Sequence, residues 1–291
     1  MMFRNGGNRL FVLAKSGRGT PSIAAAIFWT VAILAIMVAC QVGARMLFRP
    51  LLGEGTFTAD VLAEFLGFSS IFVVLWLLLR HWLRRQFSSL GFEPGGWLRH
   101  TVIGAVIALL TMAATTVGIV LAGTSISAGE LQTRGAGAIG LGLLMLLATT
   151  VQSSSEEALF RGWLLPAIGN RFGVAAGVIL SASVFMLAHA TTGPPPLGWI
   201  NLFLFGCFAA LLAIAEGGLW AASAWHAIWN WTQGGLLGFS VDRSVRQGLI
   251  ASLHPTGPDF LTGGTFGPEG GIIVTGILVV SIASVIGKKL Q

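Results

Sequence analysis

Long apolar runs, separated by short polar or glycine-rich segments, make up most of the chain. The runs cover residues 23–42, 61–79, 101–122, 138–150 and onward, 174–190, 197–215, 219–231 and 272–286. A transmembrane helix needs about 20 mostly apolar residues, so these runs predict about eight membrane-spanning helices. The expected fold is therefore an all-α, polytopic helical bundle in a membrane, without a second, soluble domain.

Composition and charge support a membrane protein. Hydrophobic residues make up 54% of the chain and charged residues only 10%, against about 25% charged residues in a typical soluble domain. The formal net charge is +6, and the basic residues gather in short segments beside the apolar runs instead of forming one stripe. That distribution is typical of membrane orientation signals rather than of nucleic-acid contacts. We expect the lipid bilayer as a partner, and no nucleic acid.

The polar segments divide the chain into five parts. They are a lead (1–22), the N-terminal transmembrane helices (23–136), a core of further helices (137–235), an extramembrane loop (236–271) and a last transmembrane helix with a basic tail (272–291). The basic segment 80–85 follows the second run, and cytoplasmic loops are enriched in Lys and Arg. With about eight spans, the lead and the tail fall on the same side as this segment. Both termini of this integral membrane protein are therefore expected in the cytoplasm.

Ionisable side chains interrupt the fourth apolar run. Such a group costs about 2.5 to 3.5 kcal/mol in hydrocarbon, and here the run continues through Glu156, Glu157 and Arg161. At helical spacing Glu157 and Arg161 lie one turn apart and can pair, whereas Glu156 points about 100° away. A carboxylate left without a cation can bind or deprotonate a water molecule as a general base. The alternative is that the two carboxylates cap a span at the membrane surface.

Two later runs also hold polar groups. Phe185 and His189 close the fifth run, and His226 and Asn230 lie within the seventh. The one-turn spacing of His226 and Asn230 puts an imidazole and an amide on one helix face. His189 could instead be an ordinary interfacial residue without a role in chemistry. His226 and Asn230 could instead form hydrogen bonds between helices.

Helix geometry predicts that Glu156 and His189 lie close together in the fold. From Glu156 the helix runs outward for roughly 18 Å to residue 168, and after a turn at 169–172 the next helix returns roughly 24 Å to His189. The two side chains then lie at similar depth on neighbouring antiparallel helices. His226 and Asn230 lie in the body of their own helix, so the sequence predicts a shared polar cavity within the membrane.

Two other polar features have no predicted role in chemistry. Asp60 and Glu64 stand one turn apart at the start of the second run, and we expect them to be structural because a helix N-terminus stabilises carboxylates. The loop 236–271 holds many of the remaining Gly and Pro residues, and this composition predicts no regular element. The sequence leaves open whether it covers the cavity, gates it or does neither.

The three places together resemble the motifs of a known family. Glu156-Glu157-x-x-x-Arg161, Phe185-x-x-x-His189 and His226-x-x-x-Asn230 follow one another on successive apolar helices. In this order they are similar to the motifs of the CPBP or Abi family. This family comprises CAAX prenyl endopeptidases of the Ras-converting type and bacterial proteins of bacteriocin processing and immunity, including lysostaphin-resistance-like proteins. The resemblance covers residues 137–235, about a third of the chain.

The resemblance implies an intramembrane endopeptidase and gives each motif residue a role. Glu156 would activate the attacking water, and His189 would help to hold it. His226 and Asn230 would polarise the scissile carbonyl and stabilise the oxyanion. The substrate would be a peptide or protein near the membrane, with or without a lipid group, since eukaryotic relatives remove the last three residues of prenylated CAAX proteins.

The resemblance also implies supporting residues and raises the question of a metal. Glu157 and Arg161 would form the ion pair that orients the catalytic carboxylate, with Phe185 beside them. One Glu and two His could bind zinc, but these motifs do not form the HExxH pattern, and two cysteines are too few for a Cys-based site. We therefore expect that no cofactor is required, with zinc as the alternative and the metal otherwise unknown.

Two other functions compete with a peptidase. A non-catalytic immunity or scaffold protein of the same fold would be favoured by the loss of a motif residue, and all of them are present here. A small transporter or proton relay would also explain intramembrane Glu and His. It predicts internal repeats with broken helices, and no repeat is visible in the sequence.

Overall fold

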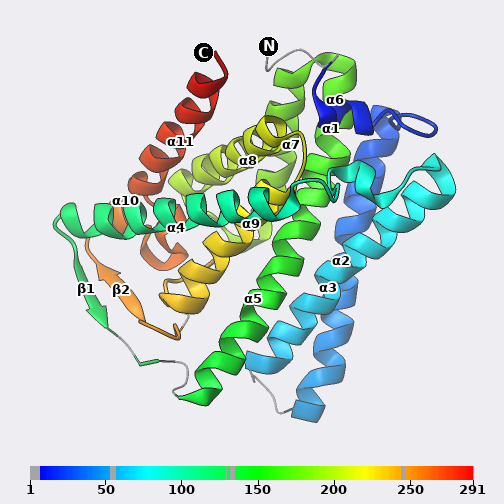
Figure 1. The fold of residues 1–291 in the computed structure, drawn as a ribbon. Helices are drawn as coiled ribbons and strands as arrows, with labels where there is room; N and C mark the ends of the chain where they lie inside the picture. Colours follow the sequence, from blue (N-terminus) through cyan, green and yellow to red (C-terminus); the bar gives the residue numbers. More distant parts are fainter. Residues whose placement is uncertain (1–6, 53–56, 129, 132–134, 244–246, 291) are drawn as a thin grey trace.

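The computed structural model describes residues 7–52, 57–128, 130–131, 135–243 and 247–290 (Figure 1). All eight apolar runs contain helices. These are α2 (Ile23–Leu52), α3 (Phe57–Leu77), α4 (Trp97–Leu121), α5 (Ala136–Glu157), α7 (Val174–Ala188), α8 (Pro196–Glu216), α9 (Trp220–Asn230) and α11 (Ile272–Leu290). The protein is a polytopic helical membrane bundle, as the pattern predicts.

Six helical segments are long and apolar enough to cross a membrane, by length and composition, within the described residues. They cover Ile23–Leu52, Ala59–Leu83, Trp97–Leu121, Gly137–Phe172, Val174–Thr192 and Pro196–Glu216. The remaining two of the eight expected spans are shorter: α9 has 11 residues, and the apolar part of α11 is Ile272–Lys288. For these two helices, crossing the membrane stays a prediction.

The outer helices present large apolar side chains on their exposed faces. Phe28 and Met46 on α2 are 63% and 74% exposed, and Leu110 on α4 is 65% exposed. Apolar surface on this scale would be unfavourable in water, and it is the surface that lipid chains cover. The bilayer is therefore the environment for which this exterior is suited.

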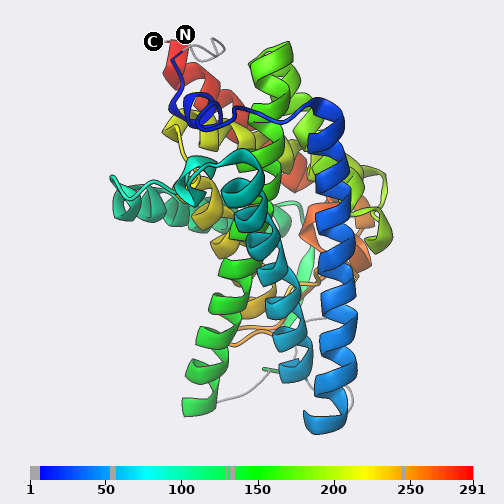
Figure 2. The same cartoon turned by 90° about the vertical axis from the view of Figure 1, so that its right-hand side faces the viewer.

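The bundle has one layer of near-parallel helices and one helix that crosses it. Helices α2, α3 and α5 run side by side (Figure 2), while α4 lies across the bundle and packs on α9 (Figure 1). The crossing is close because Gly104 of α4 has no Cβ: a Cβ there would collide with the backbone carbonyl oxygen of Ala221 on α9. This contact fixes α4 against the helix that carries the third motif.

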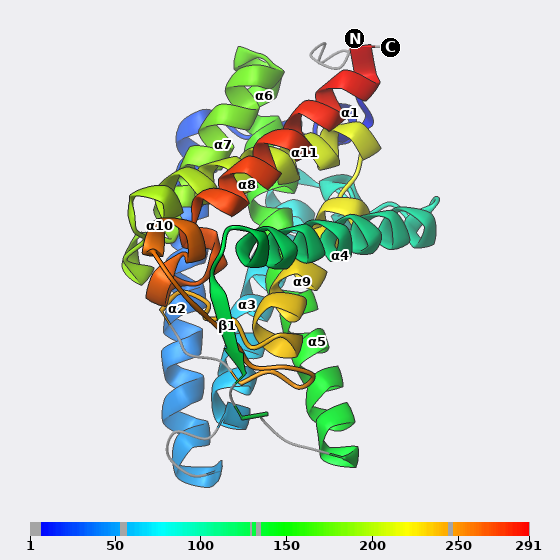
Figure 3. The ribbon, with the colours of Figure 1, turned by 90° about the vertical axis from the view of Figure 1, so that its left-hand side faces the viewer.

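The short elements occupy the chain ends and connections. They are α1 (Arg9–Leu13), η1 (Leu78–Leu83), η2 (Phe87–Leu90), η3 (Ala158–Leu164), α6 (Leu165–Phe172), η4 (Ala190–Thr192), η5 (Trp231–Leu236), α10 (Asp259–Thr262), η6 (Gly264–Phe266) and η7 (Pro268–Gly270). The N-terminal lead is docked, because the Asn170 Nδ2 atom of α6 donates to the Phe11 carbonyl of α1 over 3.1 Å. Helices α1 and α6 and the last turns of α11 lie at one end of the bundle (Figures 1 and 3). Their cytoplasmic location stays a prediction.

A small sheet is the exception to the helical fold. Strands β1 (Ser125–Ala128) and β2 (Leu253–Thr256) pair antiparallel, with Ser125 opposite Thr256. The sheet ties the loop that follows α4 to the loop 236–271, on the side of α4 away from the chain ends (Figure 3). The loop 236–271 is thus built from a strand and short helices, which neither hydrophobic periodicity nor its Gly and Pro content predicts.

The helix that carries the first motif runs further than expected. It passes from α5 through η3 and α6 to Phe172, so the predicted turn at 169–172 is wrong. The reversal occurs at Gly173, whose φ of 94° lies in the region that favours glycine. Segments η3 and η5 are π-helical and begin directly after Glu157 and Asn230. Single-turn π-helical segments inside α-helices occur frequently at functional sites.

Candidate active site

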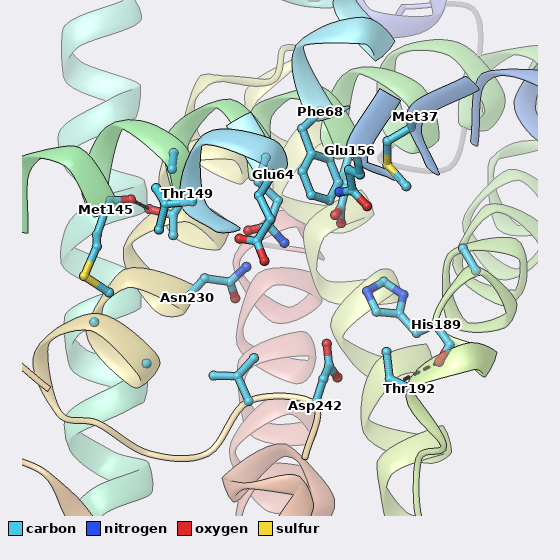
Figure 4. A pocket seen from close by; sticks show the side chains of 18 of the residues that line it. Met37, Glu64, Phe68, Met145, Thr149, Glu156, His189, Thr192, Asn230 and Asp242 are labelled. Carbon is cyan, nitrogen blue, oxygen red and sulfur yellow. Dashed lines mark hydrogen bonds between the residues drawn. The ribbon is translucent and has the colours of Figure 1, made fainter. Parts of the chain in front are cut away.

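A cavity of about 340 Å³ opens between α2, α3, α5, α9 and the end of α7. Glu156, His189 and Asn230 all line it, and their side chains surround one open space (Figure 4). These three residues come from three separate motifs. The shared polar cavity expected from the sequence is therefore present in the structure, and the catalytic roles of its residues stay predictions.

Glu156 is nearly buried, with 5% of its surface exposed. Its Oε2 atom has no hydrogen-bond partner among the described residues, and it lies 4.0 Å from His226 Nε2. A buried carboxylate oxygen without a donor is costly unless water or a ligand supplies one. This oxygen is therefore suited to bind a water molecule at the cavity wall.

Glu157 connects the first motif to the third. Arg161 Nη1 donates to Glu157 Oε1 over 3.1 Å, so the ion pair expected from the spacing is present. The same oxygen lies 2.9 Å from His226 Nδ1. Since a carboxylate can only accept, the imidazole donates through Nδ1. The Glu157–Arg161 ion pair thus orients His226, whereas the family resemblance predicted that this pair orients Glu156.

Arg161 is a fully buried cation whose two terminal nitrogens have partners, while its Nε atom has no hydrogen-bond partner among the described residues. Its Nη2 atom donates to the Gly206 carbonyl over 3.1 Å, and its guanidinium carbon lies 4.5 Å from the ring centroid of Phe185. The carboxylate and the aromatic face both compensate for the loss of hydration. Arg161 therefore neutralises Glu157 within the apolar interior.

His189 is held in one ring orientation. Its Nδ1 atom lies 2.9 Å from the Phe185 carbonyl oxygen, which can only accept, so Nδ1 carries the proton. The neutral ring then has a lone pair on Nε2. The Phe185 ring, with its centroid 4.6 Å from that of His189, packs against the imidazole. His189 can consequently accept a hydrogen bond from water with its second nitrogen.

Phe185 and Glu216 pack against or cap the helices that carry the second and third motifs. The Phe185 ring centroid lies 6.2 Å from that of His226 and 5.9 Å from that of Phe205. The Glu216 carboxylate accepts from the backbone N–H of Trp220 and Ala221, at 3.1 Å and 2.8 Å, in the first turn of α9. A carboxylate at this end stabilises a helix, so Glu216 fixes the start of the helix that carries the third motif.

The cavity also contains carboxylates that sequence reasoning did not assign to it. Glu64 of α3 lines the cavity, and its structural role stays a prediction. Asp60 has the structural role, because it pairs with Arg45 and Arg49 at 3.5 Å and 3.2 Å. Asp242, from the loop 236–271, lines the cavity as well. A residue in a loop without periodicity gives no signal of where its side chain points.

The loop 236–271 forms part of the cavity wall. Arg243 donates twice to the Gly193 carbonyl, from Nε at 3.0 Å and from Nη2 at 2.8 Å, next to the end of the second motif. Near the other end of the loop, Trp229 Nε1 donates to Glu269 Oε1 over 2.8 Å. Of the alternatives that the sequence left open, the structure therefore supports a loop that covers the site.

The donor atoms of this site do not fit a metal ion as they are arranged. Within the described residues, no group of three or more His, Cys, Asp or Glu side chains is placed to hold one.

Comparison with known proteins identifies the segment that contains this site. Residues 138–232 match the model of a family described as type II CAAX prenyl endopeptidase Rce1-like. The core of this chain is Rce1-like. The matched segment contains all three motifs, so the resemblance that the motifs indicate is confirmed for this segment.

A curated relative matches a shorter segment. The sporulation-killing factor biosynthesis protein SkfC of Bacillus subtilis (strain 168) is 35% identical to this chain over 75 residues. That segment is 24% of this chain and 15% of SkfC. The chain therefore spans only a small part of the length of this relative.

Proposed function

We propose that this Rce1-like protein is an intramembrane endopeptidase that hydrolyses a peptide bond at or near the membrane. The observation that carries the proposal is the position of Glu156, a buried carboxylate with an unused oxygen at the wall of a cavity that His189 and Asn230 also line. A peptidase needs a base, a water site and oxyanion donors around one reacting carbon. The residues that could supply them come from helices α5, α7 and α9.

In the proposed first step, Glu156 and His189 hold the nucleophilic water between them. Glu156 takes a proton from that water as the general base. His189 Nε2, the nitrogen left free by the Phe185 contact, accepts the second hydrogen of the water. Two acceptors on one water leave its oxygen lone pair directed toward the substrate carbonyl carbon.

His226 and Asn230 are the proposed oxyanion donors. His226 donates through Nδ1 to Glu157, so it can donate through Nε2 as well only when both nitrogens carry protons. The imidazolium would then sit between the carboxylates of Glu156 and Glu157, with Arg161 as the second cation. Two negative and two positive groups make this cluster neutral overall. A donor aimed at a developing oxyanion contributes about 3 kcal/mol.

The substrate is proposed to be a peptide segment that enters from the membrane. CAAX-type cleavage of a lipidated C-terminus is the specific activity that the matched family suggests. The name of the relative SkfC, a sporulation-killing factor biosynthesis protein, suggests a second role, in the biosynthesis of a killing factor. A non-catalytic immunity or scaffold role is the alternative function, and it gives no reason for a buried carboxylate with an unused oxygen at the cavity wall.

Cleavage of a quenched fluorescent peptide by purified protein in detergent tests the proposal. The substrates are a farnesylated CAAX peptide, its unprenylated form and an apolar peptide of the same length. Wild type should cleave at least one of them, and Glu156→Gln should be inactive. Glu130→Gln is the matched control, because Glu130 is exposed outside the site.

Each outcome of this experiment has a defined meaning. Cleavage by Glu156→Gln at the wild-type rate would contradict the proposed base. No cleavage of any substrate by a folded wild-type protein would favour the non-catalytic alternative. Activity that survives a chelator supports the metal-independent mechanism, and activity that a chelator removes and zinc restores contradicts it.

A further inference from the structure

A second, smaller chamber adjoins the main cavity. Its volume is about 50 Å³, and five residues line both spaces: Gln152, His189, Asn230, Val241 and Asp242. Beyond them the small chamber is closed by α8, α9, α11 and the loop 236–271, and Glu269 belongs to its wall. A polar space of this size holds a few water molecules.

Glu269 is held firmly in this wall by three helices. Its Oε1 atom accepts from Trp229 Nε1 of α9 over 2.8 Å. Its backbone carbonyl accepts from Asn201 Nδ2 of α8 over 2.7 Å. Asn201 is fixed in turn, since its Oδ1 atom accepts from the Thr275 hydroxyl of α11 over 2.7 Å. The carboxyl group is therefore preorganised rather than free to move with the loop.

The surroundings of Glu269 favour its protonated form near neutral pH. Burial raises the pKa of Glu269 to about 7, and the negative charge of Asp242 also raises it. The hydrogen bond from Trp229 and the charges of His189 and His226 act in the opposite direction. On α11 the chamber is lined by Val274 and Leu278, which carry no charge. A carboxyl group of this kind is both proton donor and acceptor at working pH.

Peptide hydrolysis also requires a proton donor on the side of the leaving nitrogen. As the carbon–nitrogen bond breaks, the leaving nitrogen must gain a proton. Glu156 takes its proton on the attacking side, and His226 and Asn230 are occupied with the oxyanion. Glu156 lines only the large cavity and Glu269 only the small chamber, and the two spaces meet at His189 and Asn230.

We propose that Glu269 is the general acid of the reaction and protonates the leaving amine; this inference rests on the proposed endopeptidase function. Water loses a proton to Glu156, and its oxygen bonds to the carbonyl carbon. The tetrahedral intermediate collapses, the carbon–nitrogen bond breaks, and the nitrogen takes the proton of the Glu269 carboxyl group. The proton on Glu156 then returns to Glu269 through the chamber waters, which restores both groups.

The pH dependence of kcat/KM for wild type, Glu269→Gln and Glu130→Gln tests this role. In wild type the acid must be protonated, so activity should fall on the alkaline side with an apparent pKa of about 7. Glu269→Gln should lose this alkaline limb, and its turnover should drop about 100-fold, the size of a general-acid contribution. Glu130→Gln, with its exposed carboxyl group, should keep the wild-type profile.

Two neighbours of Glu269 should move the alkaline limb in opposite directions. Asp242→Asn removes a negative charge, so the limb should shift to lower pH, by about half a unit to one unit. Trp229→Phe removes a donor that stabilises the carboxylate, so the limb should shift to higher pH by a similar amount. A residue that merely supports the fold would lower activity without producing shifts of opposite sign.

A substrate-free measurement keeps the inference testable if cleavage is weak. The infrared carboxyl band that is present in wild type and lost in Glu269→Gln should titrate near neutral pH. A Glu269 band that titrates below about pH 5, the ordinary range of a carboxyl group, would overturn the inference. An unchanged alkaline limb in all three variants would overturn it too, while inactivity of Glu156→Gln would still uphold the endopeptidase itself.

Discussion

His226 Nδ1 lies 2.9 Å from Glu157 Oε1, although the two residues are 69 positions apart in the chain. The same oxygen accepts from Arg161. One carboxylate oxygen therefore joins the first and third motifs, and it leaves the other ring nitrogen of His226, Nε2, 4.0 Å from Glu156 Oε2. Glu156, next to it in the sequence, remains directed to the cavity. Adjacent carboxylates thus have different surroundings because they occupy different faces of one helix.

The shared oxygen predicts the effect of Glu157→Gln. The amide keeps the shape but removes the charge that favours a doubly protonated His226. We expect turnover to fall about 10- to 100-fold, as for other residues that orient a catalytic group, with a smaller change in KM. Steady-state kinetics on the cleaved peptide checks this, with Glu130→Gln as the control. A larger loss in KM than in kcat would contradict an orienting role.

Replacing the buried Arg161 should lower the stability of the protein. Arg161→Met fills a similar volume but leaves Glu157 without its cation in a fully buried position. Removing one partner of a buried ion pair costs about 3 to 5 kcal/mol, so thermal unfolding in detergent should occur at a markedly lower temperature. The double variant Arg161→Met, Glu157→Gln removes both charges and should recover part of this loss. No recovery would show that packing, not charge, determines the effect.

The oxyanion donors predict a specific kinetic pattern. His226→Ala and Asn230→Ala each remove a group that acts most strongly in the transition state, so kcat should fall about 100-fold and KM much less. Binding of a non-cleavable peptide, measured by fluorescence anisotropy, should stay near the wild-type affinity. A change confined to binding would assign these residues to substrate recognition instead.

The contact between α4 and α9 predicts a difference between two glycines. Gly104→Ala introduces a Cβ against the carbonyl oxygen of Ala221, and overpacking of this kind costs about 1 to 3 kcal/mol. Gly140, on an open face of α5, has nothing within 4 Å of an added Cβ. Gly140→Ala should therefore leave stability unchanged or raise it slightly, since alanine is the better helix former. Equal melting temperatures for the two variants would contradict the close approach.

The sequence by itself determined the class of fold and the motif residues of the site. Apolar runs of membrane-spanning length predict the helices because backbone groups in lipid must be satisfied within the segment. The one-turn spacings of Glu157 with Arg161 and of His226 with Asn230 are local, so helical periodicity alone predicts which side chains share a face. The motif order then indicates the family, which the match over residues 138–232 confirms.

Only the tertiary structure decided how these faces are combined. The contact of Glu157 with His226 and the entry of Asp242 and Glu269 into the cavity wall depend on the packing of helices and on the path of a loop. Neither follows from periodicity, because a loop rich in Gly and Pro has no repeating pattern that relates sequence spacing to direction. Side-chain contacts between distant segments depend on how the whole chain buries its polar groups, and that is a property of the folded bundle rather than of any one helix.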